Sequence, residues 1–379
     1  METHSGQFYS QSIVRPYMPE LDSVRGIAIL MVLFFHGLAR PLGAPLPGWA
    51  RALLSISNVG WTGVNLFFVL SGFLITGILL DSRQRPDYFQ RFYFRRATRI
   101  LPALYVTLGS LWLIGQISWR FVALSAFFLA NSVNFFGLVL QYGPLWSLAV
   151  EEHFYLIWPS LIRKCKNSSL VLALGLICLG TPVLRWVGYA SGSLQPGTTI
   201  FNTWFNLDGL ALGSLLALWV RHFSFSRRRL LGMAAAGMVV GAAGFLILPH
   251  NSVAEASLIS MCCNLASVGL LGGMLLAGTS RWRFLVDRPV LKFFGFISYG
   301  LYLIHVLTFR LAEELLAPLW TGLISRQGAA TAMLLRFVAG AGLGVAIAYL
   351  SRRSLEEKFL RMRFSTRRAP SALETAAGS

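Results

Sequence analysis

An arginine and a histidine share one apolar stretch near the start of the chain. Arg25 and His36 are eleven positions apart, and eleven helical residues at about 100° each end about 20° beyond three full turns. Both side chains therefore project from one face of a helix, about 16 Å apart along its axis. This pattern could provide an anion site at Arg25 and a general base or nucleophile at His36. It also suits an arginine that reaches the lipid headgroups and a buried histidine bonded to a neighbouring helix.

Two glutamates and a histidine, Glu151, Glu152 and His153, follow one another within the segment Trp146–Tyr155. Adjacent helical side chains point about 100° apart, so we expect one glutamate to face a polar interior and the other to face the membrane interface. A carboxylate beside an imidazole would orient the ring and raise its basicity. The alternative is an interfacial helix whose acidic side chains only meet water.

Four arginines, Arg91, Arg95, Arg96 and Arg99, form a basic cluster. Guanidinium groups bind phosphate oxygens through paired hydrogen bonds, so this cluster could hold a diphosphate. A basic run beside an apolar segment is also typical of simple attraction to an anionic membrane surface. Both interpretations stay open on the residue types alone.

A polar stripe crosses an apolar segment near the C-terminal end. Ser298, Tyr302 and His305 are at positions i, i+4 and i+7, which lie on one face of a helix. Such a stripe either lines a polar lumen or joins two helices by hydrogen bonds.

Asp208 is an isolated acid just inside the end of another apolar segment. It could pair with Arg336 or Arg185, and we interpret it as part of a buried structural ion pair. The four cysteines have no paired spacing for a zinc or redox site. No metal and no permanently bound cofactor are expected, because the chain has no glycine-rich phosphate loop and no zinc constellation. It also has no Ser-His-Asp order.

The composition indicates the elements that position these side chains. Apolar residues make up 55% of the 379 residues and charged residues 13%, against about 25% charged residues in a soluble domain. The net charge of +18 is spread over short blocks between apolar stretches, which is typical of membrane topology signals and not of nucleic-acid binding. The first apolar stretch contains Arg25 and His36 and precedes no small-residue cleavage motif, so we expect it to be retained and not removed as a signal peptide.

The sequence predicts an all-α integral membrane protein. Candidate spans cover residues 21–40, 58–80, 101–118, 121–140, 145–162, 168–189, 201–220, 230–249, 256–279, 293–310 and 330–350. Basic blocks lie at 83–99, 163–166, 221–229, 281–292 and 352–368. All five blocks fall on one side if 121–162 makes one net crossing, with either 121–140 or 145–162 re-entrant or interfacial. That side then holds 25 of the 33 lysines and arginines and the other side six, which predicts about ten transmembrane helices with both termini cytoplasmic.

This topology divides the chain into three regions. We expect a cytoplasmic segment over residues 1–19, a transmembrane domain over 20–350 and a basic cytoplasmic tail over 351–379.

Five motifs in order along the chain resemble bacterial acyltransferase family 3, whose members are integral-membrane enzymes that acylate sugars and other hydroxyl-bearing acceptors. The motifs are Leu21–Gly26 with His36, Phe67–Ile75, Arg96–Pro102, Trp146–Tyr155 and Ile297–His305. The resemblance implies an acyl-CoA donor, commonly acetyl-CoA, reached from the cytoplasm of a bacterium with the protein in its inner membrane. It implies transfer to a hydroxyl of a carbohydrate or glycolipid acceptor at or beyond the outer face. Cell-surface polysaccharide or its lipid-linked precursor is the first expectation. A small glycoconjugate or macrolide-like metabolite is the alternative acceptor. The alternative function of a different class is transport of a glycolipid or carbohydrate.

The resemblance also implies roles for single residues. His36 matches the catalytic histidine and Arg25 its cationic partner, while Glu151 matches the carboxylate of its motif. Arg96 and Arg99 match an Arg-x-x-Arg pair that is needed for activity. We expect these two, together with the adjacent Arg95, to bind the phosphates of coenzyme A. The lumen candidates are Ser298, Tyr302 and His305.

The chain departs from the family pattern at two positions. His153 stands where a glutamine is common, and Asn206 stands two residues before Asp208 where an arginine is common. The second departure puts a family-type Arg–Asp pair in doubt. Many relatives carry a further extracytoplasmic domain that assists transfer, so we expect this membrane domain to act alone or with a separate extracytoplasmic helper protein.

The expected mechanism follows from these roles. The coenzyme A phosphates bind Arg96, Arg99 and Arg25, and the pantetheine arm runs along the first helix toward His36. Neutral His36 takes a proton from the acceptor hydroxyl, and Glu151 steadies the imidazolium that forms. Transfer through an acyl-histidine intermediate is the rival mechanism.

Overall fold

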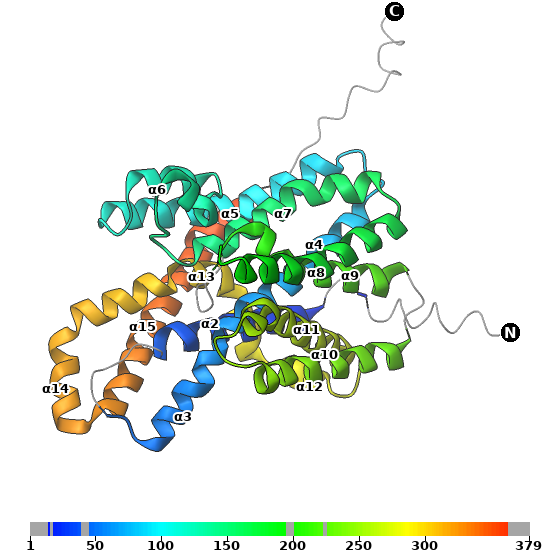
Figure 1. Cartoon of the computed structure of the whole chain (residues 1–379). Coiled ribbons are helices and arrows are strands. Elements are labelled where there is room, and N and C mark those ends of the chain that lie inside the picture. The colour runs from blue at the N-terminus through cyan, green and yellow to red at the C-terminus, as the bar shows by residue number, and fades with distance from the viewer. Residues whose placement is uncertain (1–13, 16–17, 39–44, 195–200, 223–225, 363–379) are drawn as a thin grey trace, which may run out of the picture.

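The computed structural model describes residues 14–15, 18–38, 45–194, 201–222 and 226–362. Every regular element within these ranges is helical, and no strand occurs among them (Figure 1). The long helices are α2 (Pro19–Leu38), α4 (Gly63–Ser82), α5 (Tyr88–Leu113), α7 (Leu145–Lys164), α8 (Asn167–Ala190), α9 (Leu207–His222), α10 (Arg227–Ile247), α11 (Val253–Gly278), α13 (Pro289–Leu315) and α15 (Ala329–Ser351). The shorter elements are α3 (Gly48–Ser57), η1 (Asn58–Thr62), α6 (Trp119–Ala126), η2 (Ala130–Phe136), η3 (Thr203–Phe205), α12 (Arg283–Val286), α14 (Ala317–Gln327), the π-helical turn η4 (Arg352–Glu356) and α16 (Glu357–Leu360).

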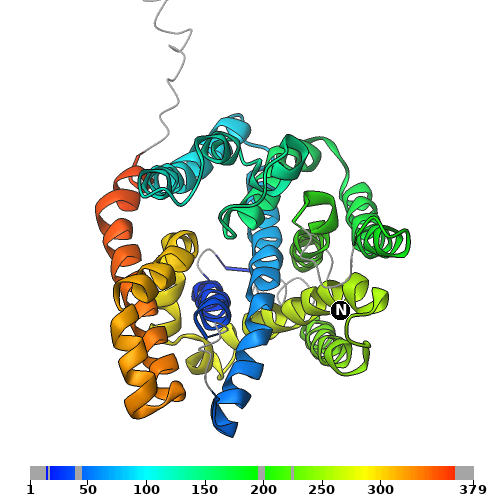
Figure 2. The ribbon, with the colours of Figure 1, turned by 60° about the vertical axis from the view of Figure 1, so that its left-hand side comes forward.

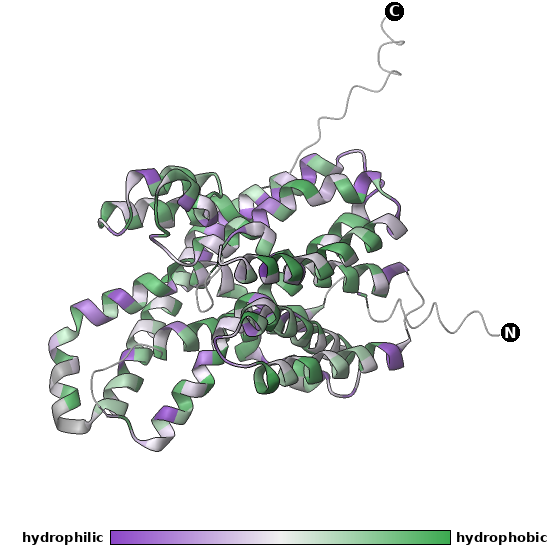
Figure 3. Cartoon of the chain, in the orientation of Figure 1, coloured by the Kyte–Doolittle hydropathy of each residue, from purple (hydrophilic) through white to green (hydrophobic). Residues whose placement is uncertain are grey.

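Seven helical stretches of the described chain are long and apolar enough to cross a membrane. They are Pro19–Leu38, Gly48–Ser82, Asn167–Ala190, Arg227–Ile247, Val253–Gly278, Pro289–Leu315 and Ala329–Leu360. Their outward faces are apolar: on α8, Leu172, Leu176 and Leu179 are between 61% and 70% exposed, and hydrophobic residues dominate these ribbons (Figure 3). Side chains of this kind favour contact with lipid over water. The prediction of an all-helical integral membrane protein is therefore confirmed.

The region over 121–162 contains one long helix. Residues 121–140 hold the end of α6, which has eight residues, and the 3-10 helix η2. An eight-residue helix rises about 12 Å, whereas the hydrocarbon core is about 30 Å thick. Residues 121–140 therefore do not form a spanning helix, which agrees with the alternative that this segment is the re-entrant or interfacial one. The continuous helix of this region is α7, with 20 residues.

The basic cluster is part of a helix and not of a loop. Helix α5 begins at Tyr88, so all four arginines of the cluster lie in its first half. The residue before the helix, Asp87, accepts a 2.8 Å hydrogen bond from Arg85 Nε and lies 3.8 Å from Arg91. The helical repeat then separates the arginines onto different faces, which matters for the site described below.

Helix α2 runs through the centre of the bundle and packs on α4, α11, α13 and α15 (Figure 2). Two glycines allow the backbones of α2 and α13 to touch. A Cβ atom on Gly26 would lie 2.0 Å from the carbonyl oxygen of Leu291, and one on Gly295 would lie 2.0 Å from that of Asp22. Only a residue without a side chain fits at such distances. The close crossing aligns the functional faces of α2 and α13 further along both helices.

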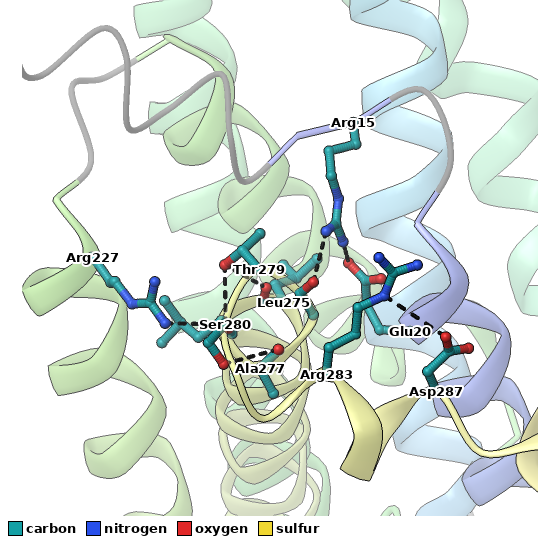
Figure 4. Close-up of polar contacts among 11 residues, drawn as sticks. Arg15, Glu20, Arg227, Leu275, Ala277, Thr279, Ser280, Arg283 and Asp287 are labelled. Carbon is teal, nitrogen blue, oxygen red and sulfur yellow. Dashed lines mark hydrogen bonds and ion pairs between the residues drawn. The ribbon is translucent and has the colours of Figure 1, made fainter.

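Polar contacts join the N-terminal segment to the end of α11 (Figure 4). Arg15 donates a 2.8 Å hydrogen bond to the carbonyl oxygen of Gly278 and forms an ion pair with the buried Glu20 at the start of α2. Arg227, at the start of α10, donates to the carbonyl oxygen of Leu276 at 3.4 Å. Basic side chains thus satisfy C-terminal carbonyl groups of α11, where the helix dipole favours positive charge.

Candidate functional site

The structure brings His36 and His305 into contact. Nδ1 of His36 lies 3.3 Å from Nε2 of His305 and 3.1 Å from the carbonyl oxygen of Val32. Nδ1 of His305 lies 2.8 Å from the carbonyl oxygen of Tyr302. His36 comes from the last turn of α2, and His305, which is fully buried, comes from the middle of α13.

The hydrogen bonds assign the protons of this pair. A carbonyl oxygen only accepts, so Nδ1 of His305 carries the hydrogen and its Nε2 is an acceptor. Nδ1 of His36 then donates to that nitrogen and to Val32. In the neutral ring this leaves Nε2 of His36 as the unprotonated nitrogen, which is the form that a general base or nucleophile requires.

His36 and His305 line a cavity of about 620 Å³, which we call the histidine cavity. Its polar lining includes His36, Asn65, Arg185, Glu255, Tyr302 and His305. Aromatic rings contribute much of the remaining surface, among them Trp61, Trp146, Tyr189, Phe201 and Phe205. The volume lies within the range of about 300–1,000 Å³ that is typical of small-molecule sites.

A second cavity, of about 150 Å³, holds the basic residues, and we call it the arginine cavity. Its polar lining includes Arg25, Arg96, Arg99, Glu151, Ser298 and Tyr302. The predicted face of Arg25 and His36 and the predicted stripe of Ser298, Tyr302 and His305 therefore both run from one cavity to the other.

The two cavities lie toward opposite ends of the helices that they share. Helix α2 contributes Arg25 to the arginine cavity and His36 to the histidine cavity, and α4 runs the other way, with Asn65 at the histidine cavity and Ile78 at the arginine cavity. Val64, Phe68 and Tyr302 line both. The hydroxyl of Tyr302 lies 2.5 Å from Oγ of Ser147, which ties α13 to α7 at this junction.

Glu151 and Glu152 do not face different environments as we expected. Both contact Arg96, at 3.7 Å and 3.1 Å, and the side chains are 16% and 13% exposed. The two glutamates point about 100° apart on α7, and the Arg96 side chain is long enough to contact both of them. It packs over the Tyr155 ring, with its Cζ atom 3.7 Å from the ring centroid. Ser71 donates to Glu151 Oε1 at 3.0 Å, and Tyr155 donates to Oε2 at 3.2 Å. Glu151 thus belongs to the arginine cavity, and the ionisable ring that lies against His36 is His305.

The predicted phosphate-binding arginines have three different environments. Arg96 is held by both glutamates, as described above. Arg99 lines the cavity and forms no ion pair or hydrogen bond within the described ranges. Arg25, Arg96 and Arg352 lie close enough to repel its charge. Arg95 is exposed and is not part of the cavity lining.

Asp208 pairs with Arg185. Nη2 of Arg185 lies 2.5 Å from Oδ2 of Asp208, and the two side chains are only 3% and 1% exposed. Arg185 also donates to the carbonyl oxygens of Phe205 and Ser257. The structural ion pair is confirmed, with Arg185 of α8 supplying the guanidinium that Asn206 lacks. The alternative partner Arg336 contacts Glu313 instead, at 3.4 Å.

The other departure from the family pattern has a packing role. Nδ1 of His153 lies 2.6 Å from Oγ1 of Thr203, which also accepts a 2.8 Å hydrogen bond from Asn131. His153 therefore joins α7 to the segments before α9 and after α6.

Three residues at the site escaped the sequence interpretation: Ser71, Ser147 and Tyr155. Tyr155 is at i+4 from Glu151 in the same motif, a spacing that brings side chains together on a helix. Ser71 lies within the motif Phe67–Ile75, but no local pattern connects it to a glutamate 80 positions away.

Comparison with known proteins agrees with the motifs. A family model described as an acyltransferase domain matches residues 18–353. The peptidoglycan O-acetyltransferase OatA of Listeria monocytogenes is 30% identical, over 77% of this chain and 49% of the relative. The putative peptidoglycan O-acetyltransferase YrhL of Bacillus subtilis is 30% identical, over 76% of this chain and 48% of the relative. The chain spans about half the length of these curated relatives. No solved structure matches.

Proposed function

The chain belongs to acyltransferase family 3, and from this membership we propose that it is a membrane O-acetyltransferase. It transfers an acetyl group from acetyl-CoA to a hydroxyl of a cell-surface polysaccharide or of its lipid-linked precursor. The names of the two relatives support a polysaccharide acceptor. The observation that carries the proposal is the pair of cavities that share Tyr302, because a donor and an acceptor that enter from opposite ends would meet there.

The arginine cavity is the proposed donor site. Arg99 is the first candidate for the coenzyme A phosphates, since its charge is unpaired among the described residues and other guanidinium groups surround it. Arg25, which lines the same cavity and pairs with Asp22 at 2.5 Å, is the supporting cation. Arg96 acts differently: it orients Glu151 and Glu152, which hold it in place. An anion would relieve the repulsion between these positive charges and form charge-assisted hydrogen bonds with them.

His36 is the proposed catalytic base. Its Nε2 takes the proton of the acceptor hydroxyl as the oxygen attacks the thioester carbonyl carbon. The carbon–sulfur bond then breaks, and the sulfur of coenzyme A leaves as a thiol after the proton returns to it. His305 is a positioning residue, because it accepts from Nδ1 of His36 and so keeps Nε2 unprotonated. General-base assistance of this kind typically contributes about 10²–10⁴-fold.

The proposed orientation places the arginine cavity on the cytoplasmic side of a bacterial inner membrane. The helices α2, α4, α5, α7, α8, α9, α10, α11, α13 and α15 then make ten crossings. The excess of basic residues on the side where α2 begins supports this orientation. The donor then comes from the cytoplasm, where acetyl-CoA is made, and the acceptor reaches the opposite end.

Radiolabelled acetyl-CoA tests the proposal directly. Membranes that contain the wild type should transfer label into an extractable glycan or glycolipid, and membranes with His36→Ala should not. His222→Ala is the matched control, because His222 lines neither cavity. Equal labelling by His36→Ala would overturn the role of His36. If the wild type released no thiol and transferred no label in the presence of native cell extract, the donor would be wrong and a transporter would become the better interpretation.

A further inference from the structure

One buried amide faces the histidine cavity with its acceptor oxygen unused. Asn65, in the first turn of α4, is 6% exposed and lines the cavity. Its Nδ2 donates to Oδ1 of Asn264 at 2.8 Å and contacts Oγ of Ser260 at 3.1 Å. Its Oδ1 has no hydrogen-bond partner in the part of the chain that the structure describes.

The contacts to α11 determine which way this amide points. Both hydrogens of the Asn65 amide nitrogen are directed at α11 side chains, so the carbonyl oxygen is presented on the other side. The oxygen is not fully enclosed by protein atoms, so a ligand hydroxyl in the cavity can reach it and donate to it.

Aromatic rings border the same cavity. Trp146 contacts both Phe201 and Phe68, with ring centroids 5.3 Å and 5.9 Å away. Trp146 is partly exposed, and all three rings belong to the cavity lining. Flat rings beside isolated polar groups are typical of sites that bind a ligand with one apolar face and a rim of hydroxyl groups.

The cavity does not suit the phosphate groups of the donor. Arg185 is its only arginine or lysine among the described lining residues, and it is already bonded to Asp208, Phe205 and Ser257. Glu255 adds a negative charge to the lining. A neutral, hydroxyl-rich ligand therefore fits better than an anion.

From these contacts we propose that the histidine cavity binds a sugar ring of the acceptor, with Asn65 and Trp146 as specificity-determining residues. The proposal rests on the proposed function and identifies where its acceptor binds. One ring face packs on Trp146, and one hydroxyl donates to Oδ1 of Asn65. That bond fixes the ring so that a different hydroxyl of the same acceptor points at Nε2 of His36. Asn65 thereby determines which hydroxyl is acetylated, without taking part in the proton transfer.

Saccharide binding to the purified full chain tests this assignment separately from turnover. The probes are chitopentaose, cellopentaose and maltopentaose, each measured by saturation-transfer NMR and by titration calorimetry. We expect at least one of them to bind the wild type in the absence of acetyl-CoA, so that binding is measured without turnover. Asn65→Ala and Trp146→Ala should bind that probe at least tenfold more weakly. Trp146→Phe should recover part of the loss, because it keeps an aromatic face.

Thr76→Val is the matched control. Thr76 is a buried residue of α4 that bonds to Ser214 and Trp158 and lines neither cavity, so its loss breaks a comparable contact between helices. This variant should bind the probe like the wild type.

Equal affinities of Asn65→Ala and Thr76→Val would overturn the assignment, as would the failure of all three probes to bind the wild type. Transfer of label from acetyl-CoA is measured on the same preparations. Sugar binding without any acetyl transfer would contradict the proposed function and leave the sugar site standing. If acetyl transfer occurs and Asn65→Ala does not change the KM for the acceptor, the proposed function stands and the sugar site is contradicted.

Discussion

The rings of His36 and His305 lie 4.8 Å apart between centroids and meet at 64°, although the two residues are 269 positions apart in the chain. The contact exists because α2 and α13 cross with their backbones touching at Gly26 and Gly295. It gives the His36 ring a defined tautomer, with its Nδ1 hydrogen shared between Val32 and His305. The same contact yields the first of four predictions.

Replacement of His305 by alanine should lower kcat by about 10–100-fold, the usual cost of removing a group that orients a functional histidine. The KM for acetyl-CoA should change by less than twofold, because His305 is not part of the arginine cavity. His305→Gln should recover part of the rate, since its amide oxygen can accept from Nδ1 of His36. Steady-state kinetics of purified protein measures each value. Thr308→Val, a buried change one turn away, is the control, and an equal loss in that variant would assign a purely structural role to His305.

Replacement of Arg99 by glutamine should raise the KM for acetyl-CoA by about tenfold or more, because charge-assisted hydrogen bonds to phosphate are worth about 1.5–3 kcal/mol. Arg95→Gln removes the same charge from the same helix, and Arg95 is exposed like Arg99 but does not line the cavity. The KM of this variant should therefore stay near that of the wild type. Kinetics at two ionic strengths provides the measurement. Equal increases in both variants would mean that the arginines attract acetyl-CoA only through general charge.

Gly26→Ala should separate α2 from α13, because the new Cβ would lie 2.0 Å from the carbonyl oxygen of Leu291. Overpacking of this kind typically destabilises by about 1–3 kcal/mol. It should also displace His36 from His305 and reduce kcat. The thermal unfolding midpoint in detergent and the rate of acetyl transfer are the readouts. Gly273→Ala is the control, since its Cβ would meet nothing within 4 Å; unchanged stability and rate in Gly26→Ala would show that the crossing tolerates a side chain.

The stability losses caused by substituting Arg185 and Asp208 should be coupled, because the two residues form a buried ion pair. Arg185→Met leaves the Asp208 carboxylate without its partner at 1% exposure, and breaking such a pair typically costs about 3–5 kcal/mol. The double variant Arg185→Met with Asp208→Leu should be more stable than Arg185→Met alone, because it removes the uncompensated charge. Thermal unfolding of the two single variants and the double variant gives the coupling energy. Additive losses would contradict the predicted interdependence.

Local pattern was enough to predict much of the architecture and part of the site. Helical spacing placed Arg25 and His36 on one face and grouped Ser298, Tyr302 and His305, and both sets line the cavities. These predictions depend only on the geometry of a single helix, which the sequence determines over short distances. Apolar length and charge blocks likewise predicted a helical membrane protein, because the cost of burying charge in hydrocarbon acts on each segment separately.

Only the tertiary structure decided which of these groups meet. The neighbour of His36 is His305 and not the expected Glu151, because α2 and α13 meet there. Arg96 forms ion pairs and Arg99 forms none within the described ranges, which depends on contacts between α5 and other helices. Asp208 pairs with Arg185 of another helix, whereas the family pattern would place an arginine at position 206. This pairing also depends on a contact between two helices. A helical pattern determines which face a side chain occupies, but not how far its helix slides or turns against a neighbour. Backbone contact at Gly26 and Gly295 sets that register in this protein, and no local pattern contains it.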